Sequence, residues 1–386
     1  MSIDFMRRIC GLAAVLLGCG CAGKGSGSGE PVESLPSGIS VILIPGITGS
    51  ALIRPESNDQ VWPPRLLSAS GDFAALQIRT DGKSEEHINA GEPLMDFYGP
   101  MVRSLEAAGH KVYPFGYDWR LDNAINAEKL ATFIDATGAA QVAIVAHSMG
   151  GLISANYLHR FGQQKVAKLL TLGTPFLGTP GSLKTLERGD YGQGLVAYLV
   201  RPKFRQLFKN EVSWYQLLPN REFFRLQPAY VRKVVRGATD STTEIRGYEA
   251  TAAFIRSRPW SNHGMVVSND RLFHQTDLLK TLASVDAYFI IGDGQPTVGG
   301  LDYIFKDQGG HEVYDDCEPV VADGDGAVLR RSANIGGKTE ALHPGHSYYV
   351  AMEHGAMIAD ELVLRQIAKI LRGDAAPLPG VRGQAE

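Results

Sequence analysis

The sequence predicts an α/β fold with a mostly parallel central sheet, helices on both faces and a cap or lid insertion. Apolar segments of strand length alternate with helical segments between residues 39 and 172, a pattern typical of consecutive βαβ units. The alternation stops between about residues 180 and 280, and regular structure resumes over 287–291. A long insertion at this point of such a fold is where a lid would lie.

Local patterns predict the elements in order. Continuous apolar or β-branched runs predict buried strands at 39–44, 111–115, 142–146, 166–172, 287–291 and 347–350. Apolar residues at helical spacing predict helices at 97–108, 124–138, from residue 152 onward and at 360–371. Residues 54–96 carry few periodic signals, and we expect this segment to be rich in loops.

The strand at 142–146 leads into Ser148, and Gly150 and Gly151 follow at once. A serine on a tight turn between a strand and a helix is the nucleophile elbow of α/β-hydrolases, written G-x-S-x-G. In this chain Ala146 replaces the first glycine. A serine that merely caps a helix fits the same five residues about equally well. The rest of the chain therefore has to decide between the two interpretations.

The length of 386 residues suits one large α/β domain with insertions, or two domains, and we place the domain at 37–372. A net charge of −3 argues against nucleic acid as the main partner. The chain has four cysteines, and only Cys21 and Cys317 would remain as thiols after the N-terminus is processed and Cys19 is lipidated. We therefore expect the fold to depend on its core rather than on disulfides.

The first residues predict export. Arg7 and Arg8 precede an apolar run that is too short to span a bilayer, so we expect residues 1–18 to be a signal peptide. Residues 16–19 resemble the lipobox of bacterial lipoproteins, which implies cleavage before Cys19 and a diacylglycerol on its sulfur. Cys21 is an alternative acceptor. A twin-arginine signal and a simple secreted protein are weaker alternatives.

Residues 19–36 are rich in Gly, Ser and Pro, which predicts a flexible tether between the lipid anchor and the domain. We therefore expect an exported lipoprotein of the bacterial cell envelope. Residues 373–386 are small and contain Pro, and we expect a disordered tail.

A serine hydroxyl needs a base, and the base needs an orienting acid. In α/β-hydrolases these follow the serine in the order acid, then histidine. His343, His346 and His354 are the histidines that come late enough in the chain. His354 precedes the last predicted helix, where the fold carries its base, so we select it.

Asp325 is the preferred acid over Asp323, because glycines on both sides allow its side chain to point inward. The same stretch resembles the start of an EF-hand calcium loop. The later ligand positions would fall on Ala327 and Asn334, neither of which is suitable. We expect no metal site and no cofactor.

Two backbone N–H groups are candidates for an oxyanion hole. Met149 follows the serine at a helix N-terminus, and Ile47 lies in a Pro-Gly loop after the first strand. An ordinary turn is the alternative for that loop. Asp118 and Arg120 are predicted to be a structural pair, with a substrate role as the less favoured alternative.

The insertion is basic and aromatic. Eight Lys or Arg lie between Tyr198 and Val235 against two glutamates, and Phe204, Leu207 and Phe208 recur on one helical face. Such a segment suits the surface of an anionic bilayer. The alternative is a helix that packs on the domain with solvated charges.

Taken together, the motifs resemble the lecithin:cholesterol acyltransferase family, particularly its lysosomal phospholipase and acyltransferase branch. They occur in the family's order and cover residues 41 to about 371. The matching segments are 44–49 (IPGITG), 117–120 (YDWR), 146–150 (AHSMG), 172–175 (LGTP), 213–219 (SWYQLLP), 324–328 (GDGAV) and 353–354 (EH).

The resemblance implies Ser148, Asp325 and His354 as a catalytic triad and the N–H groups of Ile47 and Met149 as the oxyanion hole. Family members cleave an acyl ester of a phospholipid and transfer the acyl group to water or to a lipid alcohol. We therefore expect a serine acyl hydrolase or O-acyltransferase whose partners are a lipid ester and a membrane surface. The alternatives are a carboxylesterase for smaller or neutral esters and, from another class, a non-catalytic lipid-binding lipoprotein.

Two departures concern the substrate and the lid. Ile47 and Thr48 replace a more polar or acidic start of the oxyanion loop, and residues 55–95 lack the paired cysteines of animal members.

Overall fold

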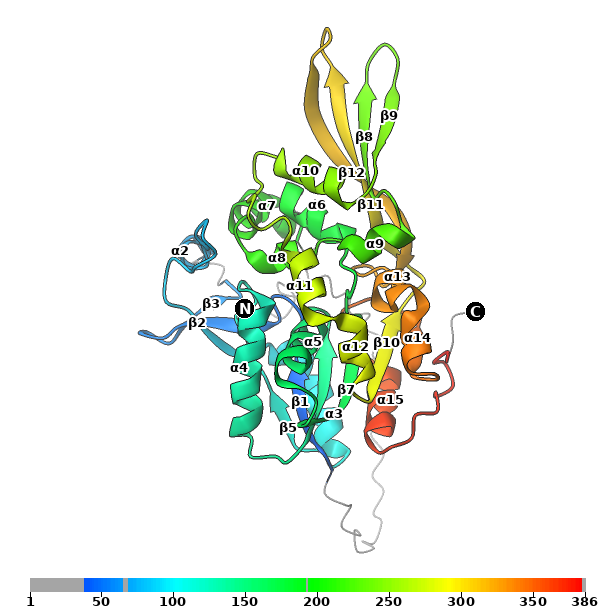
Figure 1. Cartoon of the computed structure of the whole chain (residues 1–386). Helices are drawn as coiled ribbons and strands as arrows, with labels where there is room; N and C mark the ends of the chain where they lie inside the picture. Colours follow the sequence, from blue (N-terminus) through cyan, green and yellow to red (C-terminus); the bar gives the residue numbers. More distant parts are fainter. Residues whose placement is uncertain (1–37, 65–68, 192–193, 384–386) are drawn as a thin grey trace, which may run out of the picture.

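The computed structural model describes residues 38–64, 69–191 and 194–383, and its centre is a six-stranded parallel sheet (Figure 1). The strand order is β13-β10-β7-β6-β1-β5. The strands are β1 (Ser40–Ile44), β5 (Val112–Pro114), β6 (Val142–His147), β7 (Val166–Leu172), β10 (Ala287–Gly292) and β13 (Ser347–Val350). All six were predicted, because each is a short apolar run bounded by turn residues.

Helices cover both faces of this sheet, which confirms the predicted fold class. Val41 and Leu43 of β1 belong to one hydrophobic cluster, and Ile42 and Ile44 belong to the other, as the two-residue side-chain period of a strand requires. The helices α3 (Met95–Ala107) and α15 (Glu361–Leu371) pack on the first face. The second face is covered by α4 (Asn123–Ala136), α5 (Met149–Phe161) and α12 (Leu278–Ala283).

The segment expected to be rich in loops contains regular structure. A three-stranded antiparallel sheet consists of β2 (Ser50–Arg54), β3 (Asp59–Trp62) and β4 (Asn89–Pro93), and α2 covers Ala69–Ala75. The expectation was wrong because β4 has the sequence Asn-Ala-Gly-Glu-Pro, which carries no strand pattern of its own. Its pairing with β2 is a long-range contact.

The cap consists of two separate parts of the chain, 180–276 and 295–324. Its helices are α6 (Pro180–Arg188), α7 (Gly194–Phe208), α8 (Val212–Gln216), α9 (Arg221–Leu226), α10 (Tyr248–Arg256) and α11 (Ser268–Thr276). Its sheet, in the order β12-β11-β8-β9, contains β8 (Val231–Arg236), β9 (Ser241–Ile245), β11 (Gln295–Asp307) and β12 (Glu312–Gly324).

The expected cap boundary of about 180–280 therefore leaves out the long β11–β12 hairpin, which pairs with β8 in parallel. Figure 1 shows the four-stranded sheet of the cap projecting from the cap helices, away from the central sheet. The pairing of β8 with β11 and the bonds of Arg188 on α6 to Asp316 and Cys317 on β12 join the two parts of the chain. These are tertiary contacts, so periodicity could not assign the hairpin to the cap. Smaller elements, α13 (Arg330–Ala333), the 3-10 turn η1 (Ile335–Gly337) and α14 (Lys338–Leu342), connect the hairpin to β13.

The aromatic face of the cap points inward. Phe204, Leu207 and Phe208 are fully buried, and several basic residues of the segment are engaged in ion pairs, such as Arg221 with Asp270 at 2.7 Å. Other pairs are Arg201–Asp190, Arg232–Asp302 and Lys233–Glu312. This is the packing alternative, in which the apolar side chains stabilise the domain rather than face a bilayer.

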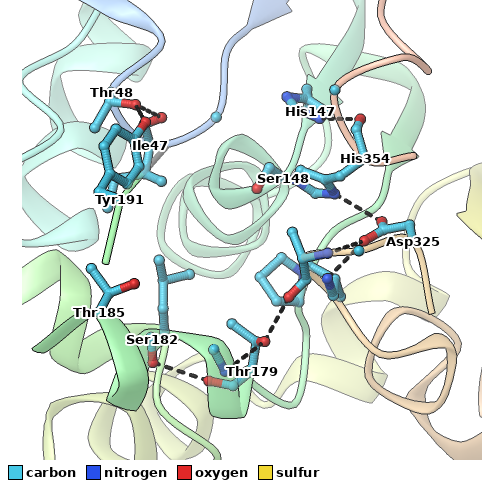
Figure 2. A pocket seen from close by; sticks show the side chains of 18 of the residues that line it. Ile47, Thr48, His147, Ser148, Thr179, Ser182, Thr185, Tyr191, Asp325 and His354 are labelled. Carbon is cyan, nitrogen blue, oxygen red and sulfur yellow. Dashed lines mark hydrogen bonds and ion pairs between the residues drawn. The ribbon is translucent and has the colours of Figure 1, made fainter. Parts of the chain in front are cut away.

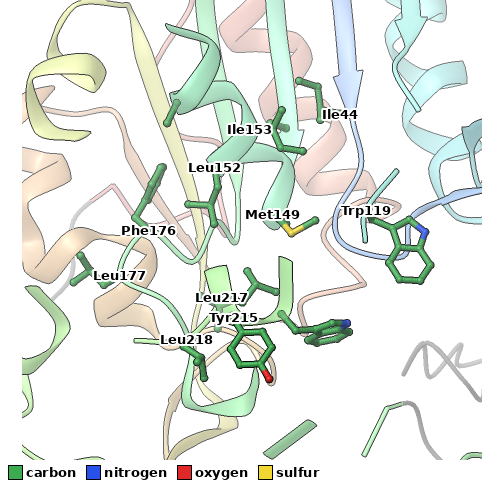
Figure 3. Close-up of a cluster of buried hydrophobic side chains, with 14 of the residues drawn as sticks. Ile44, Trp119, Met149, Leu152, Ile153, Phe176, Leu177, Tyr215, Leu217 and Leu218 are labelled. Carbon is green, nitrogen blue, oxygen red and sulfur yellow. The ribbon is translucent and has the colours of Figure 1, made fainter. Parts of the chain in front are cut away.

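The cap shares its core with the catalytic half of the molecule. One hydrophobic cluster contains Met149 and Leu152 of α5 together with Leu217 and Leu218, which follow α8 (Figure 3). Because these side chains are buried on both sides of the boundary, the cap is anchored directly above the turn that carries Ser148.

Residues 373–383 pack on the domain, so the expected disordered tail is wrong for these residues. Arg382 pairs with both carboxylate oxygens of Asp293 at 2.6 and 2.5 Å, and its backbone pairs with Tyr349. Val381 is buried. Composition suggested disorder, but a buried carboxylate on the body of the domain holds this segment.

Three predictions fall outside the described residues: the signal peptide at 1–18, the lipidated Cys19 and the tether at 19–36. Within the part of the chain that the structure describes, no helix has the length and apolar character needed to cross a membrane.

Candidate active site

Ser148 occupies a strained turn between β6 and α5. Its φ of 54° and ψ of −125° lie outside the regions that L-residues favour. Its side chain makes no capping hydrogen bond to the helix, so the simple helix-cap interpretation does not describe this serine. A side chain at position 150 would place its Cβ 2.7 Å from the carbonyl oxygen of Ile44, which explains the glycine there.

Asp325 and His354 meet next to this turn. Asp325 follows β12, His354 lies on the loop after β13, and the Nδ1–H of His354 donates to Asp325 Oδ2 at 2.8 Å (Figure 2). The other carboxylate oxygen accepts the N–H groups of Ala327 at 3.0 Å and Val328 at 2.7 Å. In Figure 2 the side chain of Ser148 lies beside the imidazole of His354. The carboxylate is 1% exposed and is held by these backbone hydrogen bonds, so its bond to Nδ1 fixes the orientation of the His354 imidazole.

The other candidates lie elsewhere. Asp323 accepts the N–H of Gly294 and pairs with Arg330, and it is 46% exposed. His343 and His346 hydrogen-bond to the carbonyl oxygens of Leu282 in α12 and of Ala287, the first residue of β10. They therefore lie near the N-terminal end of β10 and not at the turn of Ser148. The tertiary structure thus brings Ser148, Asp325 and His354 together and leaves these alternatives out.

Gly173 leaves room for the Asp325–His354 pair. A Cβ at this position would lie 2.8 Å from Nδ1 of His354 and 2.9 Å from Oδ2 of Asp325, and φ is +55°. Both observations require glycine, because a side chain would displace the imidazole or the carboxylate.

A second histidine, His147, links the Ser148 turn to the loop of His354. Its Nε2 faces the carbonyl oxygen of His354 at 3.2 Å, so Nε2 carries the hydrogen and Nδ1 accepts from the hydroxyl of Tyr98 at 2.9 Å. That hydroxyl in turn accepts the N–H of Gly46 at 2.8 Å. The two imidazole rings lie 4.6 Å apart.

Burial, together with the neighbouring His354, lowers the pKa of His147 well below its ordinary value, so this ring is neutral. The chain of hydrogen bonds connects the loop of Gly46 to the loop of His354. Sequence reasoning missed Tyr98, since a tyrosine at the start of a helix carries no signal for this role.

The loop after β1 borders the site. Gly49 N–H donates to the Gly46 carbonyl at 3.1 Å, Thr48 has a φ of 60°, and Trp62 Nε1 donates to the Thr48 carbonyl at 2.8 Å. These contacts hold Ile47 against the cavity that contains Ser148. Met149 is the first residue of α5, so its N–H has no acceptor within the helix.

The cavity has a volume of about 480 Å³, within the range of small-molecule sites. It lies between the loops that carry Ser148 and His354 and the cap helix α6 (Figure 2). Its apolar lining includes Leu94, Phe97, Trp214, Leu217, Pro296, Val298 and Ile358, and its polar lining includes Thr48, Tyr98, Thr179, Ser182, Lys184, Thr185, Asp190, Tyr191, Gln295 and Glu353.

Asp118 and Arg120 are outside that lining and form a buried pair. Arg120 donates to both carboxylate oxygens of Asp118, at 2.9 and 2.7 Å, and to the Leu76 carbonyl at 3.1 Å. The exposed side-chain fraction is 2% for Asp118 and 0% for Arg120. The pair fixes its loop, which is the structural role preferred from the sequence.

Among residues 38–64, 69–191 and 194–383, no group of three or more His, Cys, Asp or Glu side chains could hold a metal ion. At the cavity, a serine lies beside an imidazole that is hydrogen-bonded to a carboxylate, and the lining contains both apolar and polar residues.

Comparison with known proteins assigns the chain to a family. A sequence model of the lecithin:cholesterol acyltransferase family matches residues 76–300. The protein named phospholipase A(1) LCAT3 from Arabidopsis thaliana is 30% identical over 168 residues, which cover 38% of this chain and 38% of that protein. Lecithin-cholesterol acyltransferase-like 4 from the same plant is 25% identical over 186 residues, or 36% of this chain and 35% of that protein.

The matched region thus spans little more than a third of these relatives. Among solved structures, the one titled "The crystal structure of Tle4-Tli4 complex" aligns with a TM-score of 0.57 at 14% identity, and the alignment covers 86% of this chain and 98% of that one. This likeness concerns the fold alone. With more than half of its residues matched by the family model and a parallel sheet that carries a serine elbow, the chain belongs to the lecithin:cholesterol acyltransferase family and has the α/β-hydrolase fold.

Proposed function

We propose that the protein is a serine acyl hydrolase or O-acyltransferase that acts on phospholipid or related lipid esters. The observation that carries this proposal is the 2.8 Å contact between His354 Nδ1 and Asp325 Oδ2 beside the strained Ser148 turn. A carboxylate, an imidazole and a serine in this arrangement are the groups that acyl transfer requires.

In the proposed reaction, His354 Nε2 takes the proton of Ser148 while Oγ attacks the carbonyl carbon of the ester. Asp325 holds the tautomer and stabilises the imidazolium. The carbonyl oxygen becomes an oxyanion that accepts the N–H groups of Ile47 and Met149, each of which would stabilise the transition state by about 3 kcal/mol. His354 then protonates the leaving alcohol, and water or another alcohol releases the acyl group by the reverse steps.

The lipid part of the proposal is supported by the family and by the name of one relative, a phospholipase A(1). The apolar part of the cavity lining, which includes Leu94, Phe97 and Ile358, supports an acyl chain as one portion of the substrate. A carboxylesterase for small soluble esters is the alternative. Comparing rates on micellar and monomeric forms of one ester separates the two, because a lipid enzyme is faster on the micelle.

Labelling with a fluorophosphonate tests the enzymatic part. We expect one label on the wild type, on Ser148, and none on Ser148→Ala. The control variant Ser284→Ala should be labelled like the wild type, because Ser284 lies at the C-terminus of α12 and outside the cavity lining. If the wild type takes no label, the protein is a non-catalytic lipid-binding member of the fold.

Incubation with phosphatidylcholine vesicles, with and without a long-chain alcohol, distinguishes hydrolase from acyltransferase. An alkyl ester that appears only with the alcohol supports acyl transfer. Free fatty acid as the sole product in both cases limits the activity to hydrolysis.

We also propose that the protein is an exported lipoprotein anchored through Cys19. The lipobox-like segment before this residue supports the proposal. Labelling of cells with a palmitate analogue should mark the wild type and Cys21→Ala, but not Cys19→Ala. If Cys19→Ala retains the label, the assignment of the anchor is wrong.

A further inference from the structure

The loop that carries Ile47 is a β-turn over residues 46–49, in which the Gly49 N–H donates to the Gly46 carbonyl at 3.1 Å. This turn lies against the nucleophile, since a Cβ at Gly46 would be 2.9 Å from Cβ and 3.4 Å from Oγ of Ser148. The next N–H along the chain is that of Ile47, the proposed oxyanion donor. The conformation of the turn therefore decides where this donor points.

Thr48 has an unfavourable backbone conformation in this turn. Its φ is +60° at the third position, where a β-turn with positive φ usually has Gly or Asn. A β-branched residue there costs free energy, because its Cβ crowds the backbone carbonyl. A turn with negative φ at Thr48 would remove this crowding by rotating the peptide between Ile47 and Thr48. Contacts of Thr48 therefore have to favour the observed conformation.

Three hydrogen bonds hold Thr48. Trp62 Nε1 donates to its carbonyl oxygen at 2.8 Å, and its own hydroxyl donates to the Ile47 carbonyl at 2.6 Å. The hydroxyl of Tyr191 is bonded to Oγ1 of Thr48. Because the hydrogen of Thr48 is already used, Tyr191 is the donor in this pair. The bonds thus run in one direction, from Tyr191 through Thr48 to the Ile47 carbonyl (Figure 2).

Tyr191 is itself held by the cap. It lies shortly after α6 in the chain, and it lines the cavity together with Ile47 and Thr48. Its ring packs among those of Trp62, Phe204, Phe208 and Trp214, at centroid distances between 5.6 and 6.4 Å. Thr48 is 3% exposed, so little water competes for its hydroxyl. A side chain of the cap thus reaches the oxyanion loop with a hydroxyl whose position is fixed by packing.

We propose that Tyr191 is a positioning residue for the oxyanion hole: its hydroxyl holds Thr48 in the strained turn and so fixes the N–H of Ile47 beside Ser148. The cap thereby contributes to the rate without contacting the oxyanion. Thr48 is one of the two residues at which this loop departs from the family's pattern, so the resemblance did not predict this bond. The inference rests on the proposed function and names two further residues on which its rate depends.

The test measures kcat and KM on dioctanoylphosphatidylcholine and on p-nitrophenyl octanoate, with kcat expressed per site titrated by a fluorophosphonate, so that only folded protein is counted. Tyr191→Phe removes the hydroxyl and keeps the ring. We expect kcat to fall by about 5-fold, the equivalent of one neutral hydrogen bond, while KM stays within about twofold. Tyr248→Phe, the matched control, removes a hydroxyl of cap helix α10 outside the cavity lining and should keep the wild-type kcat.

Variants of Thr48 test whether Tyr191 acts through this residue. Thr48→Val removes the hydroxyl but keeps the strain, so kcat should fall by about 5-fold or more, and adding Tyr191→Phe should cause no further loss. Thr48→Ser retains the hydroxyl and should retain kcat. Thr48→Gly removes the hydroxyl and the strain together, because glycine adopts positive φ freely, so kcat should stay within about twofold of the wild type. In that background too, Tyr191→Phe should have no effect.

A pair of inhibitors separates the positioning of the donor from a general structural role. Oγ of Ser148 adds to the carbonyl carbon of 1,1,1-trifluoro-2-decanone, and its proton passes to His354. The oxygen of the resulting hemiketal accepts from the oxyanion N–H groups, whereas 2-decanone has the same chain and binds as the ketone. For Tyr191→Phe we expect Ki of the trifluoro ketone to rise by about 5-fold, in step with the loss of kcat/KM, and Ki of 2-decanone to stay the same.

Failure of this inference differs from failure of the proposed function. If the wild type cleaves neither ester, or if Ser148→Ala cleaves them as fast as the wild type, the proposed function is wrong and the inference falls with it. If cleavage depends on Ser148 but Tyr191→Phe keeps the wild-type kcat, only the inference is overturned. The same holds if Tyr191→Phe lowers kcat equally in the Thr48→Val background, or weakens both inhibitors equally.

Discussion

Glu211 makes the stability of this protein depend on pH. It lies in the cap directly before α8 and is fully buried, and Trp214 Nε1 donates to its Oε2 at 3.0 Å. The other carboxyl oxygen, Oε1, is buried without a hydrogen-bond partner within the described structure. Burial raises the pKa of this carboxyl from 4.5 to about 8, and the neighbouring Arg120 lowers it only in part.

The direction of the effect follows from proton linkage. The folded state binds the proton of Glu211 more tightly than the unfolded chain, so the stabilising contribution is complete below about pH 4.5 and is lost as the pH rises toward 8. Each pH unit in this window lowers the free energy of unfolding by about 1.4 kcal/mol. Over the whole window the loss amounts to about 5 kcal/mol.

The variant Glu211→Gln removes the titration while its amide oxygen can still accept from Trp214. Urea unfolding of wild type and variant at several pH values measures the difference in free energy between them. We expect the variant to gain about 4 kcal/mol relative to the wild type between about pH 5 and pH 8, and the difference to level off above that range. Since both proteins share all other titrating groups, the difference isolates Glu211. Two curves that stay parallel across this range would refute the reasoning.

Three further variants test the packing around the site. Gly173→Ala places a Cβ 2.8 Å from His354 Nδ1, and we expect kcat to fall by about 100-fold or more because the imidazole is displaced. Tyr98→Phe removes the hydroxyl that orients His147, and kcat should fall by about 10-fold while KM stays within about twofold, since the group acts through the loop of His354. Glu187→Gln weakens a buried pair in which Arg258 donates at 3.0 and 3.1 Å, and the free energy of unfolding should fall by about 3–5 kcal/mol.

Matched controls accompany these variants. Gly138→Ala also has a positive φ, but nothing lies within 4 Å of its Cβ, so it should lose about 1 kcal/mol of stability and no activity. Glu249→Gln breaks a pair whose carboxylate is 71% exposed and should cost less than about 1 kcal/mol. If each control behaves like its partner, the close contact at Gly173 and the burial of Glu187 are not the causes we assign. A rise in KM alone for Tyr98→Phe would contradict its positioning role.

The parallel sheet was the part of the fold that local sequence could predict. The strand at 166–172 has the bounds expected from its apolar run, because a strand buried on both faces needs no partner to be recognised. In the same way, the turn around Ser148 is visible from the small residues that follow it. Chain order then separates His354 from the histidines that precede the acid.

The cap and the surroundings of the site could not be obtained in this way. The hairpin β11–β12 joins the cap through tertiary contacts such as its pairing with β8, and β4 pairs with β2 over residues far apart in the chain. A helix with aromatic residues on one face and basic residues between them has the same pattern whether that face contacts lipid or protein. Tertiary packing decided for protein at Phe204 and Phe208.

The sequence by itself thus determined the fold class, the strand that leads into Ser148, and the order in which a serine, an acid and a base occur along the chain. Only the tertiary structure shows that Asp325 contacts His354, and only it reveals that Tyr98 and His147 link two loops of the site. The physical reason is that side-chain periodicity reports burial within one element, whereas a site depends on contacts between elements, which only their packing establishes.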